Sequence, residues 1–346
     1  MPLNKTASTS KSSKERCPYC QSTETIRKGQ RKRKFGTVQM FSCKQCFRVF
    51  TPGNVKGKVF PVAFILDALS LYDQGFSAPA CVRLLKERHG LAVSDSAIET
   101  WVKEFASVCT YGRMRDQVRR IYSPQQVIRR AKLYHRQVYE YALHRGKLDL
   151  LLAPKTEHAH LAPIRSFLEN MLLECPHALF RNTDRASSNK ADFDLAQTMI
   201  SAKQNAATRL ASLVLPTVQD NYKRHETLQN FFLLNDSVTV AVEVPIFFLP
   251  EDLIHMQERL DFKIPLQMTE AITGHIDFLQ VRNGAIHILD YKPDAPTNKP
   301  IQQLTIYALA LSRLTGLRLY DFKCAWFNED GYFEFFPLHV VHKLKR

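Results

Sequence analysis

The chain has 346 residues, 45% of them apolar, and a formal net charge of +15. This length is enough for two or three domains with a sizeable core. We find no apolar run of about 18 residues and no apolar leader after the N-terminus, so we expect a protein that is neither membrane-spanning nor exported.

The positive charge is unevenly distributed. Residues 1–136 contain 26 Lys and Arg against 9 Asp and Glu, a net +17, whereas residues 137–346 contain 22 against 24, a net −2. A basic segment binds a polyanion by releasing the counterions of its phosphates. The first part is therefore expected to bind nucleic acid; the alternative is a merely solvated surface.

Residues 1–16 are rich in Ser, Thr and Lys and predict a disordered basic tail. Residues 17–53 follow with two C-x-x-C pairs, Cys17 with Cys20 and Cys43 with Cys46. Four thiolates at this spacing favour a closed, structural zinc site of the ribbon type, and a pair of disulfides is the alternative. The basic hairpin expected between the pairs supplies four candidate DNA contacts: Arg31, Lys32, Arg33 and Lys34.

Residues 58–109 predict three short helices, at about 60–74, 77–89 and from Ser94 or Ser96 to about 105. The short link after Gly90 fits a helix-turn-helix, whose last helix would present Ser96, Thr100 and Lys103 to DNA. A plain three-helix spacer is the alternative. The ribbon motif C-P-x-C…C-x-x-C-x-x-x-F, followed by helices ending in Trp101-Val102, resembles the N-terminal DNA-binding half of insertion-sequence transposases.

Residues 110–136 are strongly basic and predict a linker along the DNA backbone or a solvated helix pair. Its candidate DNA contacts are Arg113, Arg115, Arg119 and Arg120. Residues 137–235 predict a helical connector leading into the helices before the last domain, including one long helix at about 191–230. The remaining cysteines are expected to be buried free thiols: Cys81, Cys109, Cys175 and Cys324.

Near the C-terminus, Asn283-Gly284 predicts a two-residue hairpin turn between apolar strands at about 268–282 and 285–292. The first strand carries Asp277, and the second carries Asp290 and Lys292. Because strand side chains alternate, Asp290 and Lys292 share a face that Asp277 can join. Two carboxylates would hold Mg²⁺ or Mn²⁺, and the ammonium would meet a phosphate.

This block resembles the PD-(D/E)XK nuclease superfamily, in particular its RecB-like branch, with the pattern G-x-x-D, a hairpin, h-h-D-x-K and Q-x-x-x-Y. The resemblance implies a multidomain chain whose residues 236–346 form an α/β core, a mixed sheet flanked by helices, that hydrolyses DNA phosphodiesters. It also implies a third carboxylate on the preceding strand, for which we choose Glu243 over Glu270, and site roles for Gln303 and Tyr307. The branch's G-x-x-x-H setting is missing; Asn205 and His225 are the nearest candidates.

Two alternatives stay open. One is a non-enzymatic DNA-binding protein, such as a regulator of a mobile element, with an inactive nuclease-like core. The other is a transposase, which would need a D-D-E site that we do not find in residues 137–346. With DNA as the expected partner, we place the protein in the cytoplasm at the nucleoid. Its target site, strand preference, mode of cleavage and oligomeric state stay open, a dimer being one candidate.

Overall fold

The computed structural model describes residues 15, 17, 19–20, 22–33, 36–51, 60–188, 193, 200–218, 220–260 and 263–342. The chain divides into two compact units, residues 1–65 and residues 66–346. Apart from Glu15, the tail predicted for residues 1–16 lies outside the described residues.

The first unit contains a small antiparallel sheet in the order β1-β2-β3. Its strands are β1 (Thr25–Arg33), β2 (Gly36–Cys43) and β3 (Val49–Phe50). Around the strands, Cys17, Cys43 and Phe50 form a small buried cluster, with Phe41 and Cys46 packed beside them. So little apolar burial cannot hold such a segment folded, and a metal cross-link is the usual remedy.

Four helices follow in chain order. They are α1 (Val62–Asp73), α2 (Ala78–His89), α3 (Asp95–Phe105) and α4 (Gly112–Arg119). The Ser77 hydroxyl accepts from the Ala80 N–H at the start of α2, and Gly90 ends that helix with φ of +66°. The Ser94 hydroxyl accepts from the Ala97 N–H, so Ser94 rather than Ser96 caps α3. The helix positions predicted from these caps are confirmed.

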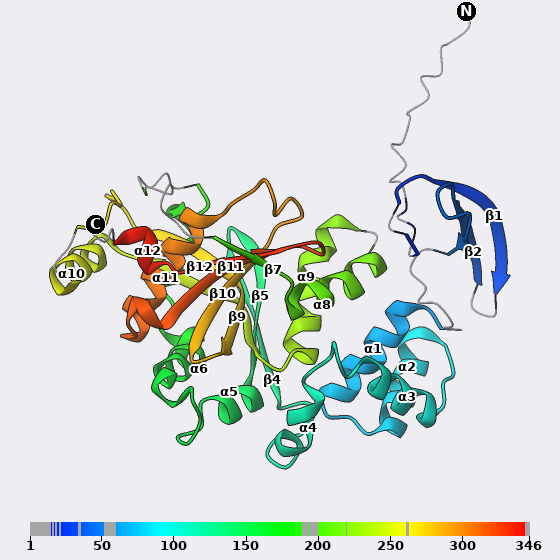
Figure 1. Ribbon diagram of the computed structural model, residues 1–346. Coiled ribbons are helices and arrows are strands. Elements are labelled where there is room, and N and C mark those ends of the chain that lie inside the picture. The colour runs from blue at the N-terminus through cyan, green and yellow to red at the C-terminus, as the bar shows by residue number, and fades with distance from the viewer. Residues whose placement is uncertain are drawn as a thin grey trace, which may run out of the picture. The chain divides into compact units, whose positions relative to one another are not determined.

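The second unit is built on a nine-stranded mixed sheet in the described part of the chain (Figure 1), in the order β4-β5-β8-β9-β10-β11-β12-β7, with β6 beside β9. Its strands are β4 (Ile128–His135), β5 (Gln137–His144), β6 (Asp184–Arg185), β7 (Ser201–Lys203), β8 (Thr239–Phe248), β9 (Ile272–Arg282), β10 (Ala285–Tyr291), β11 (Phe322–Phe327) and β12 (Tyr332–Phe335). The β10–β11 and β6–β9 pairs are parallel and the rest antiparallel.

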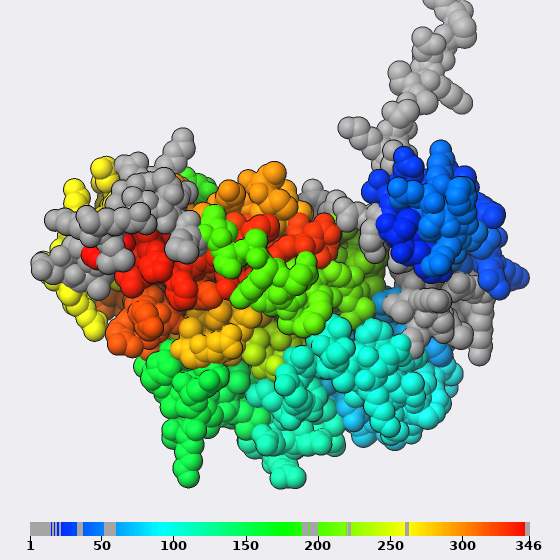
Figure 2. Space-filling model, in the orientation of Figure 1, coloured from blue at the N-terminus to red at the C-terminus, as the bar shows by residue number. Residues whose placement is uncertain are grey.

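Helices flank this sheet, as predicted. They are α5 (Arg145–Leu151), α6 (Pro163–Glu174), α7 (Leu179–Asn182), α8 (Ala206–Val214), α9 (Asn221–Asn235), α10 (Pro250–Leu260), α11 (Ile301–Thr315) and α12 (Leu338–Val341), with 3₁₀ turns at Ala159–Leu161, Leu215–Thr217 and Leu319–Asp321. Segments β7 and α8 contact the C-terminal strands: β7 pairs with β12, and the Ser212 hydroxyl donates to the Glu329 carbonyl. In the space-filling view their green atoms lie beside the red atoms of the C-terminal part (Figure 2).

Three predictions about the middle of the chain are wrong. Residues 110–136 are no linker, since they form α4 and then β4, which pairs with β5 along its whole length. In β4 the basic side chains are exposed while Leu133 and His135 are buried. The run of charges therefore belongs to the solvent-facing side of a strand and not to a linker. The helical connector expected from residue 137 therefore begins with β5. The single helix at 191–230 is divided by the 3₁₀ turn that contains Pro216.

None of the helices in the described part of the chain has the length and apolar content needed to cross a membrane.

Candidate functional site

The carboxylates singled out in the sequence meet on three neighbouring strands. Asn283 and Gly284 both have positive φ, 51° and 67°, and form the predicted turn between β9 and β10. The pairs Val242–Phe278 and Val244–Ile276 place Glu243 of β8 opposite Asp277 of β9. The last β9–β10 pair is Phe278–Leu289, so the next residue of β10, Asp290, adjoins Asp277. The strand register thus brings Glu243, Asp277 and Asp290 together.

Asp277 is held by groups from a helix and a strand. Its Oδ2 lies 2.6 Å from Nε2 of His225 on α9 and accepts a 3.1 Å hydrogen bond from the Tyr291 N–H on β10. Burial alone would raise the pKa of Asp277, but the charge and hydrogen bond of His225, with Lys292, lower it. Burial likewise opposes the charge on His225, yet Asp277 raises the pKa of His225 to about 9. The two side chains therefore form a charged pair.

Asp290 and Lys292 form a second pair at the end of β10. Lys292 Nζ lies 2.8 Å from Asp290 Oδ2, and the Lys292 N–H donates to the Phe327 carbonyl at 3.0 Å. Asp290 is almost completely buried, and burial, followed by the charge of Asp277, raises its pKa to about 7. The ammonium of Lys292 therefore offsets negative charge that the protein interior disfavours.

Glu243 occupies an unusual backbone conformation. Its φ is 49°, in the left-handed region, which costs a non-glycine residue about 1–3 kcal/mol and is concentrated at functional sites. Its Oε1 accepts a 2.8 Å hydrogen bond from Nε2 of Gln229 on α9. Burial and then the charge of Asp277 raise the pKa of Glu243 to about 7. Glu243 and Asp290 therefore resist ionising beside the charged Asp277, and carboxylate oxygens are the ligands that hard divalent cations prefer.

The rival carboxylate, Glu270, lies before the start of β9 and is exposed. The structure therefore places Glu243, and not Glu270, within the carboxylate cluster.

Gln303 and Tyr307 lie on α11, and Gln303 Nε2 donates to Tyr307 Oη at 3.0 Å. The buried phenol packs against β9, where a Cβ on Gly274 would lie 2.5 Å from Tyr307 Cε1. This close approach explains the glycine of the G-x-x-D pattern. The structure therefore gives Tyr307 a packing role against β9.

Sequence reasoning undervalued His225 and missed Gln229. Both lie on α9 at positions i and i+4, where helical side chains share a face, and each contacts one carboxylate. The signal available in the sequence was a glutamine, Gln229, four residues after His225. The prediction of one long helix at 191–230 obscured this signal, because it did not show that a separate helix, α9, begins shortly before His225.

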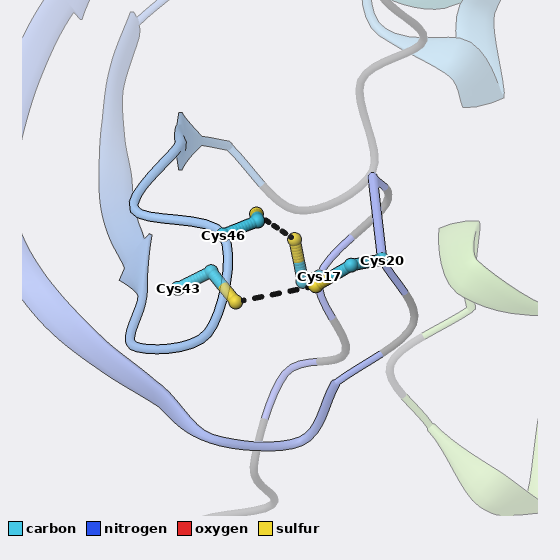
Figure 3. Close-up of side chains that lie close together, drawn as sticks. All are labelled: Cys17, Cys20, Cys43 and Cys46. Carbon is cyan, nitrogen blue, oxygen red and sulfur yellow. Dashed lines mark hydrogen bonds between the residues drawn. The ribbon is translucent and has the colours of Figure 1, made fainter.

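The four predicted zinc ligands are gathered in the first unit, within zinc-binding distance of one another (Figure 3). Cys17 Sγ lies 3.5 Å from Cys46 Sγ, and Cys20 Sγ lies 3.5 Å from Cys43 Sγ. Two sulfur atoms come from the segment before β1, one from the last residue of β2 and one from the turn after it, so one tetrahedral ion can join both ends of the hairpin. The arrangement is consistent with a zinc ribbon.

Most candidate DNA contacts are exposed in the structure. The exposed ones are Arg31, Lys32, Ser96, Thr100, Lys103, Arg113, Arg119 and Arg120. Lys34 and the side chain of Arg33 lie outside the described residues.

Arg115 is a correction, because its side chain is buried. Its guanidinium donates to the carbonyls of Tyr72, at 2.6 Å, and Phe76, at 2.8 Å, and stacks on the Tyr72 ring. Tyr72 lies in the last turn of α1 and Phe76 just after that helix, so Arg115 binds carbonyls at the C-terminal end of α1. This use leaves Arg115 unsuited to binding a phosphate.

Comparison of the chain with protein-family models, with curated proteins and with solved structures gave no match.

Proposed function

We propose that this protein is a metal-dependent nuclease that hydrolyses DNA phosphodiester bonds, with a core of the PD-(D/E)XK type. The observation that supports it most is the meeting of Glu243, Asp277 and Asp290 on adjacent strands, with Lys292 at 2.8 Å from Asp290. Structural aspartates scattered at strand ends would not converge in this way. Oxygen ligands of this kind select Mg²⁺ or Mn²⁺.

In this proposal each side chain has its own role. Glu243, Asp277 and Asp290 hold the cation, which would supply Lewis acidity toward a phosphate oxygen. Lys292 orients the attacking water and offsets the charge that develops on phosphate. His225 fixes the Asp277 carboxylate, and Gln229 fixes Glu243. By the resemblance, Gln303 would contact substrate or the surroundings of Lys292.

The basic first part of the chain would deliver DNA to this core. The net charge of +17 on residues 1–136 and the exposed basic side chains of β1, α3 and α4 support phosphate binding. The zinc ribbon and helices α1–α3 would together act as the DNA-binding part, like those of the insertion-sequence transposases that they resemble.

The proposal is tested by incubating the full-length protein with end-labelled linear DNA and with circular DNA, with and without Mg²⁺ or Mn²⁺. Metal-dependent cleavage that disappears in Asp290→Asn and Lys292→Ala, and persists in the exposed control Glu270→Gln, is the expected result. By calorimetry, Lys292→Ala should still bind metal, because the carboxylates remain, and Asp290→Asn should bind it weakly.

One observation favours the alternative of a DNA-binding protein with an inactive core. Cationic side chains, His225 and Lys292, already neutralise two of the carboxylates. A wild-type protein that binds DNA but neither binds millimolar divalent metal nor cuts any DNA form would establish that alternative and end the nuclease proposal.

A further inference from the structure

A second group of metal-ligand side chains lies within the second unit. His135 at the end of β4 and Cys175 and His177 just after α6 each offer one ligand atom, and the three atoms lie within 4.8 Å of one another. Among the described residues, only this trio and the four ribbon cysteines form such a group of three or more. His135 and Cys175 are buried, whereas His177 is half-buried and leaves the trio an approach from solvent.

The imidazoles form a chain. His177 Nδ1 lies 2.7 Å from His135 Nε2, and His135 Nδ1 lies 2.9 Å from His275 Nε2. His275 lies on β9, two residues before Asp277. Each nitrogen pair can share a single proton, so all three rings can stay neutral, the form in which histidine binds metals.

The surrounding packing fixes these rings. Phe180 stacks on His135 at 4.0 Å between ring centres, and Tyr139 stacks on His275 at 3.8 Å. The His177 N–H donates to the Cys175 carbonyl at 2.9 Å, which holds the Cys-Pro-His segment in a turn. Ligands held by packing and backbone hydrogen bonds are the condition for a preorganised metal site.

We propose that His135, Cys175 and His177 bind a second zinc ion, separate from that of the ribbon. Thiolate and imidazole ligands suit Zn²⁺ and do not suit Mg²⁺, so this site and the carboxylates would take different metals. His135 would bind through Nε2 and donate its Nδ1–H to His275, the outer partner that metal-bound histidines require. Three protein ligands leave a fourth position, open to water, on the half-buried His177 side.

Zinc at this position would tie together parts of the chain that are distant in sequence. It would join the β4–β5 turn to the segment after α6 and, through His275, to the strand that carries Asp277. The proposal does not depend on nuclease activity. The competing explanation is a chain of hydrogen-bonded imidazoles beside a free thiol.

The first test is zinc content of the purified, dialysed full-length protein. We expect two ions per chain in the wild type, one in Cys43→Ser, one in Cys175→Ser and none in the double variant. Cys324→Ser, which alters another buried thiol of the same core, should keep both ions. A wild type with one zinc that Cys43→Ser removes, or a Cys175→Ser protein with unchanged zinc content, overturns the proposal.

A second test avoids substitution of a buried thiol. His275→Gln should keep the three ligands but weaken zinc binding about 10- to 100-fold, the usual effect of losing an outer partner. It is measured by competition with a chelator in the Cys43→Ser background, where the second zinc is the remaining one. The exposed His255→Gln is the control. Equal zinc affinity in His275→Gln and His255→Gln would contradict the assigned role of His275.

Discussion

His225 Nε2 lies 2.6 Å from Asp277 Oδ2 and joins α9 to β9. The His225 ring also meets the Tyr291 ring edge-on at 5.3 Å, and the Tyr291 N–H donates to the same carboxylate. One carboxylate therefore connects a helix and two strands, and it stays charged because His225 is charged beside it. Among the residues outside the sequence motifs, we therefore expect substitution of His225 to change the stability of the fold most.

Replacing His225 with Gln should remove the charged partner of Asp277. Because Asp277 raises the pKa of His225 from 6.5 to about 9, the pair stabilises the fold fully below pH 6.5 and less as the pH rises through 9. His225→Gln should therefore lower the free energy of unfolding at neutral pH and much less above pH 9. Urea unfolding of both proteins across this range measures the difference. The exposed His255→Gln should show no such pattern, and a constant deficit at all pH values would refute the charged pair.

Glu243 should make stability fall as the pH rises, in the absence of added divalent metal. Its pKa is raised from 4.5 to about 7, so between these values the folded protein keeps a proton that the unfolded chain releases. The folded state then binds more protons, and raising the pH favours unfolding.

Glu243→Gln should flatten this part of the pH profile, measured by urea unfolding, whereas Glu270→Gln should leave it unchanged. Added Mg²⁺ should flatten the wild-type profile too, because bound metal stabilises the ionised carboxylates. Parallel profiles for the wild type and Glu243→Gln would show that Glu243 is not a buried titrating group.

Gly274→Ala should destabilise the core by about 1–3 kcal/mol, the usual effect of overpacking. The added methyl would lie 2.5 Å from Tyr307 Cε1 and 2.7 Å from Oη, so the ring must move. Gly112→Ala is the control, because nothing lies within 4 Å of a Cβ there. Combining Gly274→Ala with Tyr307→Leu should cost less than the sum of the two changes. Additive effects in urea unfolding would mean that the two residues do not compete for space.

The exposed basic residues of the ribbon should set the salt dependence of DNA binding. Each phosphate contact contributes about 0.9 to the slope of log K against log salt, so Arg31→Gln with Lys32→Gln should reduce the slope by about 1.8. The control replaces two exposed basic residues elsewhere, Lys155 and Arg209, with Gln. Fluorescence anisotropy with a labelled duplex at several salt concentrations measures both. Similar slopes for the two double variants would locate DNA binding outside the ribbon hairpin.

Cys43→Ser should release the ribbon zinc and unfold the ribbon strands, because the buried cluster around the cysteines is too small to persist alone. Limited proteolysis should then cut within residues 1–65 and spare residues 66–346, which have their own large core. Cleavage spread through the second unit would show that the units do not fold separately.

Structural features that depend on residues close together in the sequence were predictable from the sequence. Helix caps such as Ser77 and Gly90, the Asn283-Gly284 turn and the paired cysteines act over a few positions, so their spacing alone indicates the local structure. The alternation of strand residues likewise placed Asp277, Asp290 and Lys292 near the end of one hairpin. Glu243 could be chosen because a carboxylate within an apolar strand needs a partner.

Tertiary structure alone decided which distant side chains meet. His135 and His275 are 140 positions apart, and His225 and Asp277 are 52 apart. Nothing in a local pattern links such residues, because their contact depends on strand order and helix packing. The same limit explains two errors. The basic residues before His135 were interpreted as a linker, although they belong to a strand whose charged side chains face solvent. Arg115 was interpreted as a surface charge, although its buried guanidinium binds the carbonyls of Tyr72 and Phe76 at the end of α1. Local spacing determined the motifs, and long-range packing determined the sites.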